Sequence, residues 1–164
     1  MPLKSQEFLE SRGIPFETVA FPVEMEKGVA SISQFLRDRV NARQVVKSLM
    51  FETSSGEVVL VLVGGDQNVI SGQLKRALGD RNIRMAAPDR IRQISGYEIG
   101  SIPPFSWQPA GFRTLIEATL LSESVLAVGA GQWGIEILLS PADLLRATQG
   151  VPVDLATRKD SPSE

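Results

Sequence analysis

The stretch that decides the fold is Gln44-Val45-Val46-Lys47-Ser48-Leu49-Met50-Phe51. It is rich in apolar and β-branched residues and is followed by a Ser-Ser-Gly turn, which is typical of a β-strand. Side chains alternate across a strand, so Lys47 shares one face with Leu49, and Ser48 lies on the other face. Both faces are mostly apolar, which predicts a strand that is covered on both sides.

Lys47 is the unusual residue of this strand, because an ammonium group is costly to bury without a partner. Two interpretations remain open from the strand alone. Lysine is often used to protect the edge of a sheet, with its stem packed and its charge in water. Alternatively, Lys47 reaches into a pocket and meets a polar group there.

Regular elements are predicted on both sides of this strand. Helices are expected over residues 5–12, 71–78, 88–95 and 141–149, and another begins with Ser31 as its cap. Further strands are expected over 14–21, 58–63, 83–85, 112–118, 125–128 and 135–139. Strands outnumber helices and do not alternate regularly with them. This pattern predicts an α+β fold with a mixed, largely antiparallel, curved sheet flanked by helices, in one domain over 1–156 with a flexible tail over 157–164.

The chain of 164 residues contains neither histidine nor cysteine. Ser-His-Asp and Cys-His triads, thiolate nucleophiles and His- or Cys-based zinc sites are therefore excluded. The longest strongly apolar run, 58–63, is too short to span a bilayer, and no secretory signal is evident. Absence of cysteine is typical of cytoplasmic proteins. An enzyme with this composition must work with lysine, carboxylates, hydroxyls, backbone amides or groups of its substrate.

Positive charge is concentrated in two segments, although the formal net charge is −2. One runs from Lys75 to Arg92, and the other contains Arg37, Arg39, Arg43 and Lys47. Charge alone favours a solvated, ordinary protein surface. The alternative is a local surface that follows nucleic-acid phosphates.

Two loops and two carboxylates are the remaining candidates for a site. Gly129-Ala130-Gly131-Gln132-Trp133-Gly134 lies between two predicted strands and suits either a hairpin turn or a backbone cradle for an anion. The segment 96–105 combines glycines with two adjacent prolines, so it is either a structural corner or a stiff pocket wall. Glu117 and Glu136 lie in apolar strands, and Glu136 could equally point to water.

In order along the chain, these pieces resemble the YbaK-like aminoacyl-tRNA deacylases, which include the editing domain inserted in bacterial prolyl-tRNA synthetases. The resemblance covers roughly residues 31–155. The chain departs from the usual family pattern at Ser106, Glu117 and Gly129, where glycine, aspartate and a hydroxyl residue are common. The matching segments are Val45–Leu49, Arg84–Ala86, Ser95–Phe105, Leu115–Glu117, Gly129–Gly134 and Leu139–Leu145.

The resemblance implies hydrolysis of the ester between a wrong, small amino acid (Ala, Cys or Ser) and the 3′ end of a tRNA such as that for proline. It implies catalytic roles for Lys47 and for the backbone of Gly129, Ala130 and Gly131, which would stabilise the oxyanion with assistance from the ribose hydroxyl of the tRNA. It implies no cofactor and no metal, and the partners are aminoacyl-tRNA and a synthetase. The alternatives are a non-catalytic tRNA- or synthetase-binding module and a small-molecule-binding regulator. The implied substrate-binding residues are Ser48, Gly100, Ser101, Ile102, Pro103, Pro104, Phe105 and Glu136.

Overall fold

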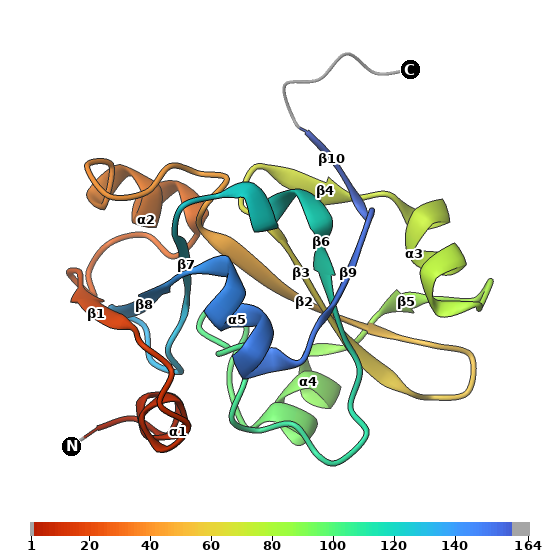
Figure 1. The fold of residues 1–164 in the computed structure, drawn as a ribbon. Coiled ribbons are helices and arrows are strands. Elements are labelled where there is room, and N and C mark those ends of the chain that lie inside the picture. The colour runs from red at the N-terminus through yellow and green to blue at the C-terminus, as the bar shows by residue number, and fades with distance from the viewer. Residues whose placement is uncertain (1, 159–164) are drawn as a thin grey trace.

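The computed structural model describes residues 2–158, and it has the α+β class predicted from the sequence (Figure 1). The helices of this part of the chain are α1 (Lys4–Ser11), α2 (Val29–Phe35), α3 (Ser71–Leu78), α4 (Pro88–Ser95) and α5 (Pro141–Thr148), with a 3₁₀ helix η1 (Ala118–Ser122). The strands are β1 (Glu17–Ala20), β2 (Val46–Glu52), β3 (Val58–Gly64), β4 (Gln67–Val69), β5 (Arg84–Met85), β6 (Thr114–Glu117), β7 (Leu126–Gly129), β8 (Ile135–Leu139), β9 (Val151–Val153) and β10 (Ala156–Arg158). Within residues 2–158, no helix is long and apolar enough to cross a membrane.

The strands form a mixed five-stranded sheet in the order β5-β2-β3-β6-β9, an antiparallel three-stranded sheet in the order β1-β8-β7, and the pair β10-β4. Strands β2 and β3 form the predicted antiparallel hairpin, whereas β6 joins β3 and β9 in parallel pairs. Figure 1 shows β2 running from the three-stranded sheet across the larger one. This strand therefore connects the two sheets at one end of the molecule.

The alternation predicted for β2 is confirmed by its packing. Val46 and Met50 belong to a core cluster with residues of α4 and α5, whereas Leu49 and Phe51 pack on the opposite face with residues of α3. The whole of β3 is buried between these two clusters, in accord with its unbroken apolar sequence. Both faces of the central hairpin are thus covered.

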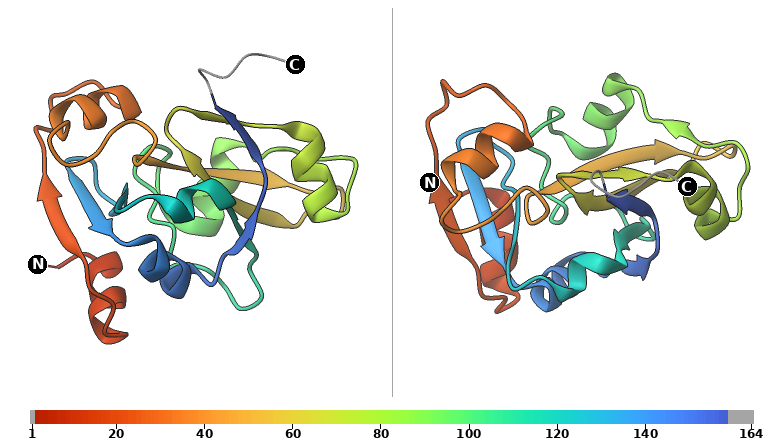
Figure 2. Two further views of the ribbon diagram at one scale, coloured as in Figure 1. Left: turned by 45° about the horizontal axis from the view of Figure 1, so that its top comes forward. Right: turned by 90° about the horizontal axis from the view of Figure 1, so that it is seen from above.

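Helix α2 differs from its prediction. It starts after Gly28, so Ser31 lies within the helix and is not its cap. Ile32 and Leu36 are buried in a third core cluster, but Phe35 is 48% exposed. The helix lies beside β8 and the beginning of β2 in both views of Figure 2, where it covers the junction of the two sheets.

Three short strands were not predicted: β4, β9 and β10. Each has only three residues and depends on a partner that is distant in sequence. Strand β10 pairs Thr157 with Asn68 and Arg158 with Gln67, so the first part of the expected tail is a strand in this structure. Residues 159–164 of that expected tail lie outside the described residues.

Candidate functional site

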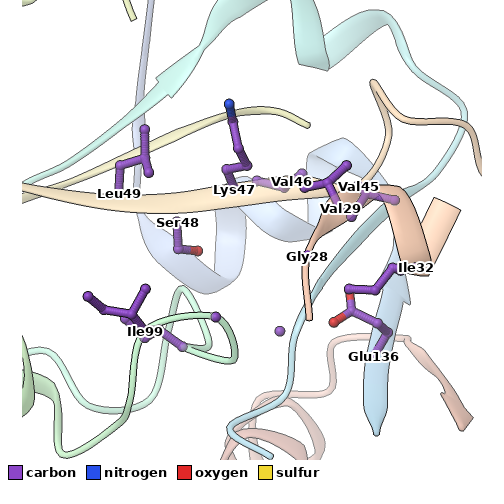
Figure 3. Close-up of a pocket in the computed structure, with 13 residues that line it drawn as sticks. Gly28, Val29, Ile32, Val45, Val46, Lys47, Ser48, Leu49, Ile99 and Glu136 are labelled. Carbon is purple, nitrogen blue, oxygen red and sulfur yellow. The ribbon is translucent and has the colours of Figure 1, made fainter. Parts of the chain in front are cut away.

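A cavity lies where β2 and β7 separate, below α2 (Figure 3). Its volume is about 190 Å³, less than the roughly 300–1,000 Å³ of pockets that hold drug-sized ligands. Most of its wall is apolar, with a few polar groups. The lining residues are Gly28, Val29, Ile32, Val45, Val46, Lys47, Ser48, Leu49, Ile99, Gly100, Ile102, Gly129 and Glu136.

Strand β2 presents Ser48 and Lys47 to different sides. Figure 3 shows the Ser48 side chain pointing toward the loop that carries Ile99, and the Lys47 ammonium pointing away from both. Lys47 Nζ donates a hydrogen bond to the backbone carbonyl of Gln67, 2.5 Å away, at the start of β4. Lys47 therefore borders the cavity through its position on β2, while its side chain points to the other side of the strand. The expected orientation of the ammonium into the cavity is not the one observed, and its catalytic role stays a prediction.

Glu136 is the buried carboxyl of the cavity. It lies on β8 opposite Val19 and Gly129, and it is 4% exposed. Desolvation in this apolar environment raises the pKa of Glu136 from 4.5 to about 8. The option that this side chain points to water is therefore excluded, and at neutral pH the carboxyl is mostly protonated.

The glycine-rich turn after β7 contributes only its first residue to the cavity. Gly129 lines the wall, and a side chain there would lie 2.9 Å from the carbonyl oxygen of Ile102. Ala130 is buried, and its carbonyl accepts a hydrogen bond from the hydroxyl of Ser5 at 2.6 Å. The N–H of Gly131 donates to the Ser101 carbonyl at 2.8 Å. Glycine at 129 thus permits close contact between the turn and the proline-containing loop.

The proline-containing loop, residues 96–105, lines the cavity with one part and supports that wall with another. Gly100 and Ile102 line the cavity, together with Ile99, which is 56% exposed. The second half of the loop accepts hydrogen bonds that hold this wall in place. The Pro103 carbonyl accepts from the indole N–H of Trp107 at 2.6 Å, and the Pro104 carbonyl accepts from the Gln108 amide at 2.9 Å. The segment therefore serves both as a structural corner and as a pocket wall.

Helix α1 supports both parts of this wall. Ser5 holds Ala130 as described, and the Phe8 ring stacks on the buried ring of Phe105 with 5.6 Å between centroids. Residues near the beginning of the chain therefore fix the two loops that border the cavity. Nothing in the local sequence of α1 indicates this role, because both contacts join residues that are far apart in the chain.

Glu117 lies outside the cavity. It is 0% exposed, and it accepts hydrogen bonds from Thr119 and from the backbone N–H groups of Leu155 and Ala156, the latter two at 2.8 and 3.0 Å. Burial raises the pKa of Glu117, but these hydrogen bonds outweigh it and the pKa lies below its usual value. Its role is to attach the C-terminal segment to β6.

Gln67 connects Glu117 with Lys47. Its side-chain amide donates to the Thr119 hydroxyl at 3.2 Å, while its backbone carbonyl accepts from Lys47. Glu117 and Lys47, both candidates from the sequence analysis, are therefore joined in one polar network on the side of the sheet opposite the cavity. Across residues 2–158, no group of three or more carboxylates is arranged to hold a metal ion.

Among the described residues, five of the ten basic residues in the two basic segments form ion pairs with carboxylates. Arg39 pairs with Glu17 and Arg43 with Asp66 in the first segment. In the second, Arg84 and Arg90 share Glu52, and Arg92 contacts Asp89 and Glu98. Part of this charge is therefore neutralised locally, and contact of these segments with nucleic acid stays a prediction.

Several cavity residues were not identified from the sequence. Those on α2 have a detectable signal, because Gly28 precedes a helix whose Val29 and Ile32 are three residues apart and share a face. Ile99 and Leu49 carry no such signal, since their exposure to the cavity depends on how the loop folds over β2. The missed lining residues are Gly28, Val29, Ile32, Val45, Val46, Leu49 and Ile99.

Comparison with known proteins gives a consistent result. Residues 25–147 match the model of the aminoacyl-tRNA editing domain family. A solved structure described as a candidate trans-editing enzyme for prolyl-tRNA synthetase superposes with a TM-score of 0.83 and 26% sequence identity, covering 94% of this chain and 95% of that one. The fold and the sequence thus point to the same group of proteins.

Two curated relatives show how much of this chain, and how much of each relative, is matched. The proline–tRNA ligase of Moorella thermoacetica is 30% identical over 124 residues, which are 76% of this chain but 20% of the ligase. The multifunctional Ser/Thr-tRNA deacylase ProXp-y of Escherichia coli K12 is 32% identical over 93 residues, 56% of this chain and 54% of the deacylase. The chain therefore spans about a fifth of that ligase and about half of that deacylase. With three quarters of its length matched by the family model, the chain belongs to the aminoacyl-tRNA editing domain family.

Proposed function

We propose that this chain hydrolyses the ester between a small amino acid and the terminal ribose of a mischarged tRNA. The observation that carries this proposal is the buried Glu136 carboxyl in a small apolar cavity at the separation of two strands. Membership of the editing-domain family and the name of the deacylase relative support it. The proposed partner is the 3′ end of aminoacyl-tRNA in the cytoplasm, alone or beside a synthetase.

The size and polarity of the cavity favour a small amino acid. Its volume of about 190 Å³ and its aliphatic walls leave little room beyond the aminoacyl group and the ribose edge. A synthetase distinguishes one methylene by only about 1–3 kcal/mol, so a second site must remove small misfits. Alanine, cysteine, serine and threonine are therefore the amino acids to test.

Glu136 is proposed to bind the α-amino group of the substrate. An α-amino group has a pKa of about 7.7–8.0, close to the value of about 8 for the buried carboxyl. A positively charged amino group in the cavity favours the ionised form of this carboxyl, because an opposite charge nearby lowers the pKa that burial has raised. Binding through Glu136 would select esters that have a free amino group.

The chemistry requires positioning rather than a strong nucleophile, because an aminoacyl ester is already activated. Water attacks the ester carbonyl carbon, the bond from that carbon to the ribose oxygen breaks, and the ribose oxygen takes a proton. With no histidine or cysteine in the chain, the neighbouring ribose hydroxyl is the proposed proton acceptor for water. Lys47 is proposed to contact the terminal phosphate of the tRNA, which requires its ammonium to exchange the Gln67 carbonyl for that anion.

The test is incubation of the protein with alanyl-, cysteinyl-, seryl- and threonyl-tRNA prepared on tRNA for proline and on other tRNAs. We expect release of at least one amino acid, with strong losses for Glu136→Gln and Lys47→Ala. Glu7→Gln on the exposed face of α1 is the matched control and should retain activity. Binding that protects the ester from hydrolysis would contradict the proposal and favour the non-catalytic module.

A further inference from the structure

We propose that the separation of β2 and β7 forms the binding site for the ester carbonyl oxygen, with the backbone N–H groups of Ser48 and Gly129 as its donors. This inference rests on the proposed function and adds to it the groups that stabilise the reacting atom. It follows from the pairing of the strands around the cavity, which determines the direction of each backbone group.

The direction of the β2 backbone groups follows from two observations. The Met50 carbonyl accepts from the Ala86 N–H at 3.0 Å, on the side of β5, and the Thr53 N–H donates to Glu57 at 2.8 Å, on the side of β3. In an antiparallel strand, the N–H and C=O of one residue point to the same side, and the side alternates along the chain. The backbone N–H and C=O groups of the even-numbered residues of β2, including Ser48, therefore point away from β3.

Strand β7 faces Ser48 across the cavity. The Ala127 N–H donates to the Gln44 carbonyl at 2.8 Å, away from β8, so the same alternation points the Gly129 N–H away from β8 as well. Val45 and Ala127 form an isolated parallel bridge. The next pair in that register, Lys47 with Gly129, is not bridged, so the two strands separate between these positions.

The cavity occupies this separation. Ser48 and Gly129 both line it, and the β5 ladder on β2 begins only at Phe51. The edge of β2 at Ser48 is therefore free of a neighbouring strand among the described residues. Two strands that diverge from a common bridge point both the N–H and the C=O groups of these residues into the gap, and N–H donors that meet there are placed to stabilise an oxyanion.

The glycine-rich turn that follows β7 supplies fewer donors than its composition suggests. The Gly131 N–H is used by the Ser101 carbonyl. Gly129 is the residue of this turn that lines the cavity, and its N–H points away from β8. Its partner donor thus comes from Ser48, which precedes it by 81 residues in the chain.

The first measurement is amide hydrogen exchange by NMR on the intact protein. The N–H groups of Ser48 and Gly129 should exchange rapidly, whereas those of Leu49 and Val128, which face β3 and β8, should be protected. Addition of 3′-alanylamino-3′-deoxyadenosine, whose amide replaces the reactive ester, should then shift and protect Ser48 and Gly129. Protection of both groups before addition, or no response after it, would overturn the inference.

The second measurement replaces single backbone amides by esters, which deletes one N–H and retains the side chain. Replacement at Ser48 should lower kcat by about 100-fold or more, the usual effect of removing one oxyanion donor, with KM changed less than threefold and Tm unchanged. The same replacement at Phe51 is the matched control, because its N–H faces β3 and it does not line the cavity. It should lower Tm and leave kcat within about twofold.

These experiments separate the two proposals. A wild-type protein that releases no amino acid from any aminoacyl-tRNA refutes the proposed function, and the exchange and ligand experiments still decide on the two donors. An active wild-type protein with normal kcat after replacement at Ser48 refutes the carbonyl site alone. Equal loss of kcat at Ser48 and Phe51 also contradicts it, because the effect would then come from the strand as a whole.

Discussion

Replacing Glu136 with glutamine should raise the stability of the protein above pH 5 and lower its deacylation activity. Glutamine has nearly the same shape as the protonated glutamate, but it cannot ionise. The wild-type carboxyl has a pKa of about 8 in the folded protein, against 4.5 as its ordinary value, because burial penalises its charged form. Between these two pH values, the folded state binds a proton that the unfolded state releases, so wild-type stability falls as the pH rises.

The size of this effect follows from the change in pKa. An increase from 4.5 to about 8 costs the folded state about 5 kcal/mol once the carboxyl is ionised, since each pKa unit corresponds to about 1.4 kcal/mol. Native proteins have a total stability of about 5–15 kcal/mol, so a single buried group of this kind dominates the pH profile. Relative to the wild type, Glu136→Gln should therefore gain about 3–4 kcal/mol between pH 5 and pH 8.

The assay is urea unfolding of both proteins at a series of pH values from 4 to 9, together with deacylation kinetics. The two free energies of unfolding should be similar near pH 4 and diverge above pH 5, where the variant becomes the more stable protein. The variant should bind substrate poorly, because it cannot form an ion pair with the amino group. A difference in stability that stays constant from pH 5 to pH 9 would refute the assignment of a raised pKa to this carboxyl.

Three further substitutions test the surroundings of the site. Ser106 has a φ of 84° and a buried hydroxyl without a hydrogen-bond partner among the described residues, so Ser106→Gly should raise stability by about 1 kcal/mol, measured as Tm. Glu117→Gln should lower stability by about 2–4 kcal/mol near neutral pH, and the loss should diminish as acid protonates the wild-type carboxyl, measured by urea unfolding. Gly129→Ala should disturb the loop at Ile102 and reduce deacylation at least tenfold, whereas Gly72→Ala, with open space around it, should keep full activity.

The sequence predicted the elements whose signals are local. Helix α4 is bounded by Pro88 in its first turn and Gly96 in a left-handed conformation, and α5 has the Ser140 cap that its sequence indicates. The hairpin of β2 and β3 follows from two apolar strands around a glycine turn. These signals lie within a few residues of one another, so they operate before any tertiary contact is made.

The features that could not be predicted from the sequence depend on contacts between distant parts of the chain. Strand β10 pairs with the distant strand β4, and the backbone at Leu155 and Ala156 donates to Glu117, 38 and 39 residues away. The family resemblance identified Lys47 as important, but it could not show that its ammonium would meet the carbonyl of Gln67. The burial of Glu136 likewise depends on α2 and the proline-containing loop, neither of which is its neighbour in sequence.

The proposed chemistry depends on where the sheet is interrupted. A continuous pairing of β2 with β7 would use the N–H groups of Ser48 and Gly129 within the sheet and would leave no cavity between them. The strands instead separate after a single bridge, and the contact of Ser101 and Ile102 with Gly129 holds the loop over the gap. Because a side chain at 129 would collide with this loop, the glycine maintains both the opening and its cover. In a chain without histidine or cysteine, the proposed reaction would depend on such backbone donors for stabilisation of the oxyanion.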